Sequence, residues 1–269
     1  MCRMRNWRDL WILLGLSVVL SACNKAGPFA DQGTLRVGME LTYPPFEMQD
    51  KSGNPDGVSV DLAEALAKDL GRPLKIVPMS FSGLIPALKT KNIDLIISSM
   101  TATEERSQSI DFSDPYAFAG LALLVAKDSD IQSVEDLKSP GRTISAKATT
   151  TGETWAINHL PNAKRMIFED PSACVLEVVQ GRADAFIYDP LSIYKYALQN
   201  SGTTRGLLKP FVEESWGIGI AKGNDALRKR VNQFIARFRE EKGFEVLGDK
   251  YFSEEKKFLE SQGIPFVLR

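Results

Sequence analysis

The sequence predicts an α/β fold with mainly parallel sheets, arranged as two similar lobes. From Thr34 onward, short runs of β-branched or apolar residues alternate with helical patterns, which is typical of this fold class. The 269 residues, 43% hydrophobic and 25% charged, suffice for about two globular domains. Residues 87–97 and 178–187 also resemble each other, because each segment reads as helix, tight turn, aspartate (Asp94 or Asp184) and buried strand. This repeated unit favours two lobes of one kind.

The individual elements follow from periodicity and from helix-breaking residues. Residues 57–70 have apolar side chains at helical spacing, and Gly71 and Pro73 end the pattern. Further helices are predicted over 82–91, 103–108, 133–138, 152–159, 171–181, 190–199, 225–241 and 243–250. Strands are predicted near 35–38, 74–77, 94–97, 143–146 and 184–188.

Composition and motifs exclude several functional classes. The 33 basic and 34 acidic residues leave a net charge of -1, which provides no overall attraction to nucleic acid. Neither half contains a Gly-rich phosphate-binding motif. The cysteines, Cys2, Cys23 and Cys174, lack the spacing of a zinc or redox site, and the single histidine, His159, is expected at the surface. We therefore predict neither a metal nor a cofactor, and we expect Cys174 to be buried.

The N-terminus has the layout of an export signal. Residues 1–22 contain early arginines, an apolar run and small residues at the end, and the run is shorter than the about 20 residues of a membrane span. The segment Leu20-Ser21-Ala22-Cys23 resembles a bacterial lipobox, so we expect a lipoprotein signal peptide and acylation of Cys23. Ordinary secretory cleavage near Ala22 is the alternative. With Cys23 acylated, residues 23–33 would tether the protein to a membrane surface.

Polar residues follow several of the predicted strands. Ligands of open α/β sheets bind outside the carboxyl ends of the strands, so these residues are the candidates for a binding site. They are Glu40 and Tyr43, Ser98 to Thr101, Lys147 to Thr151, and Asp189.

The segment Thr101-Ala102-Thr103-Glu104 fits a capping box with Thr101 as the N-cap. A helix start favours a bound carboxylate, and Arg106, one turn into this helix, could grip that carboxylate with two N–H groups. The alternative is a surface arginine that pairs with Glu104 or Glu105.

Asp189 ends the apolar run 185–188 and precedes Pro190, which favours the first position of a helix. An N-cap role would explain this aspartate without any ligand. If Asp189 instead faces Arg106 across a cleft, one anion and one cation would recognise the ammonium and carboxylate groups of an α-amino acid.

The candidates for contact with a ligand side chain are Glu40, Tyr43, Phe81, Lys147 and Tyr188, whereas Phe46 is expected in the core. Glu40 suggests a basic side chain, and Lys147 suggests an uncharged or acidic one. The alternative is that these two residues pair with each other. We expect a polar L-amino acid.

Ordered motifs resemble those of the periplasmic amino-acid-binding proteins of ABC importers, bacterial solute-binding family 3. The resemblance covers about 34–252. It is carried by Leu35-Arg36-Val37-Gly38 before Tyr43-Pro44-Pro45-Phe46, by Gly57 with Val60-Asp61-Leu62, by Leu84 to Leu88 before Asp94, and most specifically by Met100 to Arg106 before Asp111 to Tyr116.

The resemblance implies a two-lobe clamshell of the type II periplasmic-binding-protein fold. Lobe 1 would comprise 34–115 and 218–269, lobe 2 would comprise 121–211, and 116–120 with 212–217 would form the hinges. The implied carboxylate contacts are Arg106, Thr101 and main-chain donors of Thr150 and Thr151. The implied ammonium contacts are Asp189 and the Ser99 carbonyl, while Tyr43 and Phe81 flank the ligand side chain. Thr149 occupies a position where the family usually has glycine, which puts the geometry of this loop in question.

The resemblance implies a monomeric, lipid-anchored binding protein in the periplasm or at the cell surface that serves an ABC permease. One alternative is an enzyme on the same scaffold, similar to cyclohexadienyl dehydratases, with Glu40 as a conceivable proton donor. Another is an accessory protein that presents its ligand to a receptor.

Overall fold

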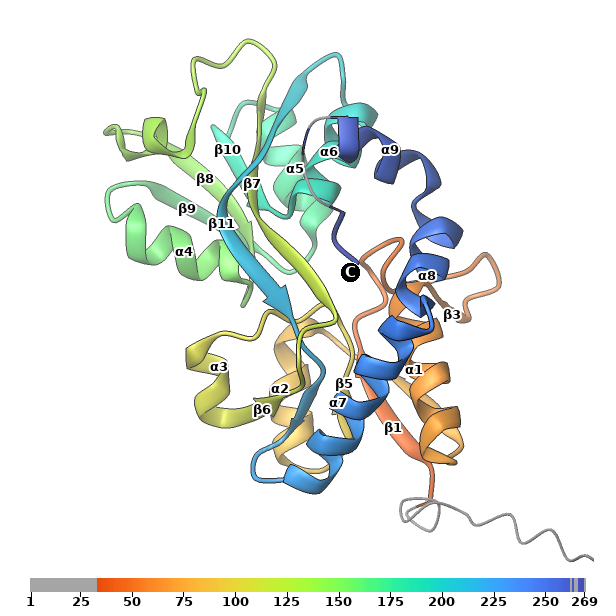
Figure 1. Ribbon diagram of the computed structural model, residues 1–269. Coiled ribbons are helices and arrows are strands. Elements are labelled where there is room, and N and C mark those ends of the chain that lie inside the picture. Colours follow the sequence, from red (N-terminus) through yellow and green to blue (C-terminus); the bar gives the residue numbers. More distant parts are fainter. Residues whose placement is uncertain (1–32, 262, 264–265, 269) are drawn as a thin grey trace, which may run out of the picture.

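The computed structural model describes residues 33–261, 263 and 266–268, so the predicted signal peptide and Cys23 lie outside the described residues. Two five-stranded sheets occupy separate halves of the molecule (Figure 1). The first sheet has the order β4 (Leu74–Pro78), β1 (Leu35–Met39), β5 (Leu95–Ile96), β12 (Gly219–Ala221), β6 (Ile110–Phe112). The second has the order β9 (Lys164–Phe168), β8 (Thr143–Lys147), β10 (Ala185–Tyr188), β7 (Ala117–Ala126), β11 (Thr204–Trp216).

The two sheets have the same topology. In each, four strands run in one direction, and the fourth strand in the order given, β12 or β7, runs against them. The predicted α/β class with mainly parallel sheets is therefore confirmed, and so is the two-lobe arrangement.

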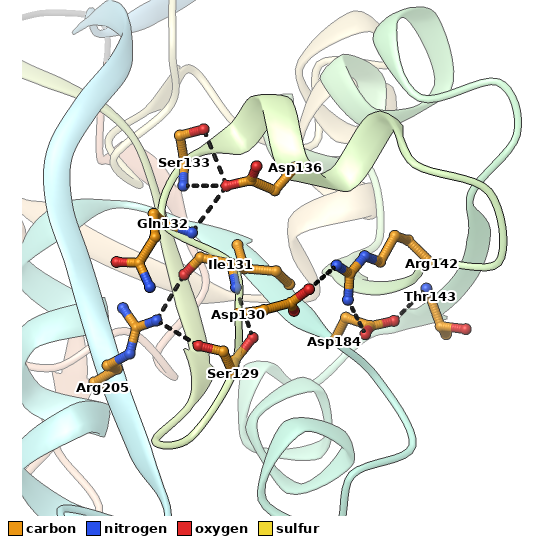
Figure 2. Close-up of polar contacts among 10 residues, drawn as sticks. All are labelled: Ser129, Asp130, Ile131, Gln132, Ser133, Asp136, Arg142, Thr143, Asp184 and Arg205. Carbon is orange, nitrogen blue, oxygen red and sulfur yellow. Dashed lines mark hydrogen bonds and ion pairs between the residues drawn. The ribbon is translucent and has the colours of Figure 1, made fainter.

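The repeated aspartates occupy equivalent places in the two lobes. Asp94 precedes β5 and accepts a hydrogen bond from the Arg36 N–H at 2.8 Å. Asp184 precedes β10 and accepts one from the Thr143 N–H at 2.7 Å, and Figure 2 shows Arg142 on the same carboxylate. Each aspartate thus links two neighbouring parallel strands at their start, which explains the internal resemblance in the sequence.

The helices agree with the predicted ones to within about two residues at most ends. They are α1 (Val58–Leu70), α2 (Phe81–Lys89), α3 (Glu104–Ser109), α4 (Thr151–His159), α5 (Pro171–Val179), α6 (Pro190–Gln199), α7 (Asp225–Glu240), α8 (Gly243–Tyr251), α9 (Ser253–Ser261) and the 3-10 helix Val134–Lys138. A small hairpin, β2 (Met48–Gln49) with β3 (Pro55–Asp56), precedes α1. The sequence interpretation did not include α9, β6, β9 and β12.

Apolar side chains are buried on both faces of each sheet. Along β7, Leu121, Leu123 and Val125 belong to one buried cluster of the second lobe, whereas Ala122 and Leu124 belong to another. This alternation follows from the two-residue period of a strand and explains why β7 is apolar throughout. Cys174 is fully buried in one of these clusters and His159 is exposed, as expected.

Strands β7 and β11 run between the lobes as an antiparallel pair (Figure 1). Their register pairs Ala117 with Trp216 and Leu121 with Val212, so the predicted hinge segments 116–120 and 212–217 lie side by side. Their action as hinges stays a prediction.

The C-terminal helix α9 lies beside α6 of the second lobe (Figure 1). Phe258 stacks on Tyr194 with ring centroids 4.1 Å apart, and Glu255 forms an ion pair with Lys195 at 3.4 Å. Leu259 of the same helix is buried in the core cluster of the first lobe. The segment assigned to lobe 1 by sequence therefore also contacts lobe 2. Among the described residues, no helix is both long and apolar enough to cross a membrane.

Candidate functional site

A cleft between the lobes contains every ligand-binding residue that the sequence predicted. Its empty volume is about 510 Å³ with open solvent included. The predicted residues that line it are Glu40, Tyr43, Phe81, Ser99, Thr101, Arg106, Lys147, Thr150, Thr151, Tyr188 and Asp189. The cleft also contains residues that the sequence interpretation missed, notably Glu47, Glu214 and Trp216.

Arg106 lies in the first turn of α3, but the predicted capping box is wrong. The N-cap is Thr103, whose hydroxyl accepts a hydrogen bond from the Arg106 N–H at 3.2 Å. Thr101 stays in an extended conformation because it forms a β-bridge with Trp216, a residue far away in the sequence. The N-cap therefore lies two residues later than predicted, and Glu104 occupies the first helical position instead of the third.

The Arg106 guanidinium group contacts both lobes. It donates one hydrogen bond to the Thr101 carbonyl at 2.8 Å and another to the Thr149 carbonyl at 2.9 Å. It also lies 5.4 Å from the ring centroid of Phe81, within the range of a cation–π contact. Burial lowers the pKa of Arg106 from its ordinary value, yet an arginine stays charged. In the described structure no ion pair joins Arg106 to Glu104 or Glu105, so the surface-pair alternative is wrong.

Asp189 has both a structural contact and an unused oxygen. It is the N-cap of α6, and its Oδ1 accepts a hydrogen bond from the Ser192 N–H at 2.9 Å. Its Oδ2 is buried and has no hydrogen-bond partner among the described residues. Burial raises the pKa of this carboxyl group, because a desolvated negative charge is costly, and the nearby Tyr43 hydroxyl and the Ser192 N–H oppose that effect. A cation in the cleft would satisfy Oδ2.

Glu214 comes from β11 and connects the two lobes. Its Oε2 accepts hydrogen bonds from the hydroxyls of Thr101 and Thr151, each at 3.1 Å. Burial raises the pKa of Glu214, and these hydrogen bonds and the nearby Arg106 charge oppose that effect. Two hydroxyls near the expected carboxylate position thus already hold a carboxylate of the protein. The only sequence signal was an acidic residue in a predicted crossover strand.

The loop before α4 has the left-handed backbone that the missing glycine would favour. Thr149 has φ +60°, and its N–H donates to the Glu153 carboxylate at 2.6 Å. Thr150 is the N-cap of α4, and its hydroxyl donates to the Lys147 carbonyl at 2.7 Å. The loop therefore keeps this conformation although a β-branched residue is strained there. The first N–H groups of α4 lie at the cleft, where they can bind an anion.

Glu40 and Lys147 form an ion pair across the lobes. Lys147 Nζ lies 3.0 Å from Glu40 Oε1 and also donates to the Glu169 carbonyl at 2.5 Å. Glu40 Oε1 further accepts a hydrogen bond from the Phe81 N–H at 3.3 Å. The alternative in which these two residues pair with each other is therefore the observed arrangement.

Aromatic side chains form one wall of the cleft. Tyr43 packs edge-on against Tyr188 and Trp216, with centroid distances of 5.7 and 6.0 Å. Phe46 lies behind Tyr43, is 1% exposed and contacts Phe252, so its expected place in the core is confirmed. Burial, together with the nearby Asp189 charge, raises the pKa of Tyr43.

Glu47 is a buried carboxyl group at the cleft. Its Oε2 accepts hydrogen bonds from Ser59 at 2.6 Å and from Ser99 at 3.0 Å. Burial raises its pKa to about 8, and the serine hydroxyls only partly offset this effect. Glu47 is therefore mainly protonated at neutral pH. The available sequence signal was that Glu47 directly follows Phe46, a residue expected in the core. Nothing in the local sequence indicates that Glu47 itself is buried.

Comparison with known proteins agrees with this geometry. The family model "Bacterial extracellular solute-binding proteins, family 3" matches residues 35–254. The L-cystine-binding protein TcyJ of Escherichia coli strain K12 is 31% identical over 248 residues, which cover 88% of this chain and 92% of that protein.

Solved structures are similar as well. The crystal structure of the ancestral amino acid-binding protein AncCDT-1, a precursor of cyclohexadienyl dehydratase, has a TM-score of 0.76 and 39% identity over 82% of this chain and 96% of that one. An ancestral arginine-binding protein bound to glutamine has a TM-score of 0.75 and 38% identity over 82% and 99%. The chain belongs to the bacterial extracellular solute-binding proteins of family 3.

Proposed function

We propose that this protein captures a free polar L-amino acid between its lobes and delivers it to the permease of an ABC importer. The observation that carries the proposal is the buried Asp189 Oδ2, which has no partner among the described residues and lies in the same cleft as the Arg106 guanidinium. A buried carboxylate whose hydrogen bonds are incomplete is costly unless a cation meets it. The ligand ammonium supplies that cation.

The two charged ends of an α-amino acid fit opposite parts of the cleft. Arg106, the Thr150 N–H and the first N–H of α4, from Thr151, bind the ligand carboxylate, and the Thr101 hydroxyl lies in the same cleft. Asp189 and the Ser99 carbonyl bind the ammonium. Because these groups come from both lobes, a bound ligand favours the closed arrangement, and the permease recognises that arrangement.

Export and anchoring complete the proposal. The signal-like residues 1–22 direct the chain across the membrane, and acylation of Cys23 holds the mature protein in the periplasm or at the cell surface. The protein acts as a monomer and changes no covalent bond of its ligand. The names of the related L-cystine-binding and arginine-binding proteins support this binding role.

A dehydratase activity is the second candidate, since AncCDT-1 is described as a precursor of such an enzyme. The sequence suggested Glu40 as the proton donor, but its Oε1 is already occupied by Lys147 Nζ at 3.0 Å and by the Phe81 N–H at 3.3 Å. Incubation of the protein with prephenate should therefore yield no phenylpyruvate. Enzyme-dependent formation of phenylpyruvate would replace the binding proposal by the enzymatic one.

A thermal-shift screen of the purified protein against the twenty amino acids tests the proposed function. A ligand that binds only the folded state, present at a hundred times its Kd, adds about 2.7 kcal/mol to the free energy of unfolding. We expect a clear rise in the melting temperature with at least one polar L-amino acid and none with its D-enantiomer. An unchanged melting temperature with all twenty would refute the proposal.

A further inference from the structure

The cross-lobe pair of Glu40 and Lys147 lines the cleft and places one buried charge on each lobe. The Lys147 side chain is 2% exposed and that of Glu40 is 12% exposed. Glu40 follows β1 of the first lobe, and Lys147 is the last residue of β8 in the second. The pair therefore lies where both sheets present the carboxyl ends of their strands.

We propose that Lys147 determines specificity: by pairing with Glu40 it excludes basic side chains and selects amino acids with an uncharged polar side chain. This inference rests on the proposed amino-acid site and adds the class of its ligand. A carboxylate at Glu40 alone would attract a guanidinium or ammonium group. In this chain that carboxylate already has its cation.

A basic ligand would have to displace Lys147 from Glu40. Lys147 would then keep only the Glu169 carbonyl, its other hydrogen-bond acceptor at 2.5 Å, and its charge would stay buried without a counter-ion. Removing one partner of a buried ion pair is strongly destabilising. The charge of Lys147 therefore repels the side chains of arginine and lysine, and the Glu40 carboxylate is not free to attract them.

The other carboxyl groups of the cleft do not replace Glu40 as the acceptor of a basic side chain. Glu47 is held by serine hydroxyls, and burial keeps it mainly protonated. Glu214 accepts hydrogen bonds from Thr101 and Thr151. Asp189 is the acceptor for the ligand ammonium.

An uncharged polar side chain fits the pair without disrupting it. The ammonium group of Lys147 has three N–H donors, of which two point to Glu40 and the Glu169 carbonyl. Its remaining donor and the second oxygen of Glu40 can serve a carboxamide or hydroxyl group. An acidic side chain would meet the negative charge of Glu40, so it is excluded too.

Isothermal titration calorimetry with glutamine, asparagine, serine, threonine, arginine, lysine and glutamate tests the inference on wild type and variants. The wild-type protein should bind at least one of the four uncharged amino acids about a hundredfold tighter than arginine or lysine. Lys147→Met should raise the affinity for arginine or lysine by about tenfold or more, and the added change Glu40→Gln should remove that gain. Lys138→Met is the matched control, since Lys138 forms an exposed pair with Glu135 outside the cleft.

Glu40→Gln alone provides the reciprocal measurement if Lys147→Met fails to fold. It leaves Lys147 without its counter-ion, so the affinity for glutamate should rise by about tenfold or more. Wild-type protein that binds arginine or lysine as tightly as an uncharged amino acid would overturn the inference while leaving the proposed function intact. Wild-type protein that binds no amino acid would instead overturn the proposed function.

Discussion

The two oxygens of Asp189 have different surroundings. Oδ1 caps α6 through the Ser192 N–H, and Oδ2 lies buried at the cleft without a partner in the described part of the chain. The sequence pattern of an aspartate before Pro190 predicted the cap, and a cap alone would have explained the residue. The buried oxygen without a partner is what supports the proposed binding role in addition to the N-cap, and only the three-dimensional structure reveals it.

The left-handed backbone at Thr149 predicts a stabilising substitution. Thr149→Gly should raise the free energy of unfolding by about 0.5–1 kcal/mol, because glycine relieves the strain of a β-branched residue at φ +60° but loses more chain entropy. Urea unfolding measures the difference. Thr150→Gly is the control, since Thr150 has φ −89° and should gain nothing. A less stable Thr149→Gly protein would contradict this account of the loop.

The buried carboxyl of Glu47 predicts a pH dependence of stability. Its pKa is about 8 in the folded protein and 4.5 ordinarily, so between these values the folded state binds more protons than the unfolded state. The stabilisation is therefore complete below about pH 4.5 and is lost as the pH rises through about 8. Glu47→Gln should flatten the fall in melting temperature between about pH 4.5 and pH 8. An equally steep fall in the variant would show that another group is responsible.

Arg106 and Asp189 were predictable because each lies in a local pattern, the Met100 to Arg106 motif and the aspartate before Pro190. Glu214 was not, because its contact with Thr101 joins residues 113 positions apart. Such a contact depends on the packing of β11 beside the first lobe, and no local pattern encodes that packing.

At the scale of elements, an aspartate at the start of a repeated unit connects two strands in each lobe. Asp184 accepts the Thr143 N–H and one nitrogen of Arg142, whereas Asp130 contacts the same arginine from an exposed position (Figure 2). Their side chains are 31% and 75% exposed. We infer that Asp184 fixes the register of β8 beside β10.

Because Asp184 is partly buried and Asp130 is exposed, substitutions of these two residues form a matched pair of variants. Asp184→Ala should lower the free energy of unfolding by about 1–2 kcal/mol, because it leaves the Thr143 N–H without its acceptor and removes one of the two carboxylates that Arg142 contacts. Asp130→Ala should change it little, since exposed ion pairs contribute little. Chemical denaturation of both variants measures the effect. Equal losses of stability in the two would contradict the role assigned to Asp184.

The long helices and buried strands were predictable because their periodicity extends over enough residues to be recognised. Strands β6 and β12 have three residues each, too few to show alternation. The N-cap of α3 was placed two residues early because the bridge between Thr101 and Trp216 overrides a local capping pattern. Tertiary contacts therefore determine where these elements begin and end, which the local sequence alone does not determine.

At the scale of the whole molecule, several polar contacts join the lobes at the cleft. Lys147 pairs with Glu40, Arg106 donates to the Thr149 carbonyl, and Glu214 accepts from hydroxyls of both lobes. The described arrangement is therefore one in which the lobes touch through the proposed site. A zwitterion between Arg106 and Asp189 would add to these contacts and favour the same arrangement.

Calorimetric titration of Arg106→Ala and Asp189→Asn with the amino acid found in the thermal-shift screen tests the central claim most directly. Asparagine preserves the N-cap of α6, and Arg228→Ala, in an exposed pair with Asp225, controls for the loss of an arginine. We predict that each cleft variant stays folded and loses affinity by about a hundredfold or more, while the control binds like wild type. Wild-type affinity in either cleft variant would contradict the account.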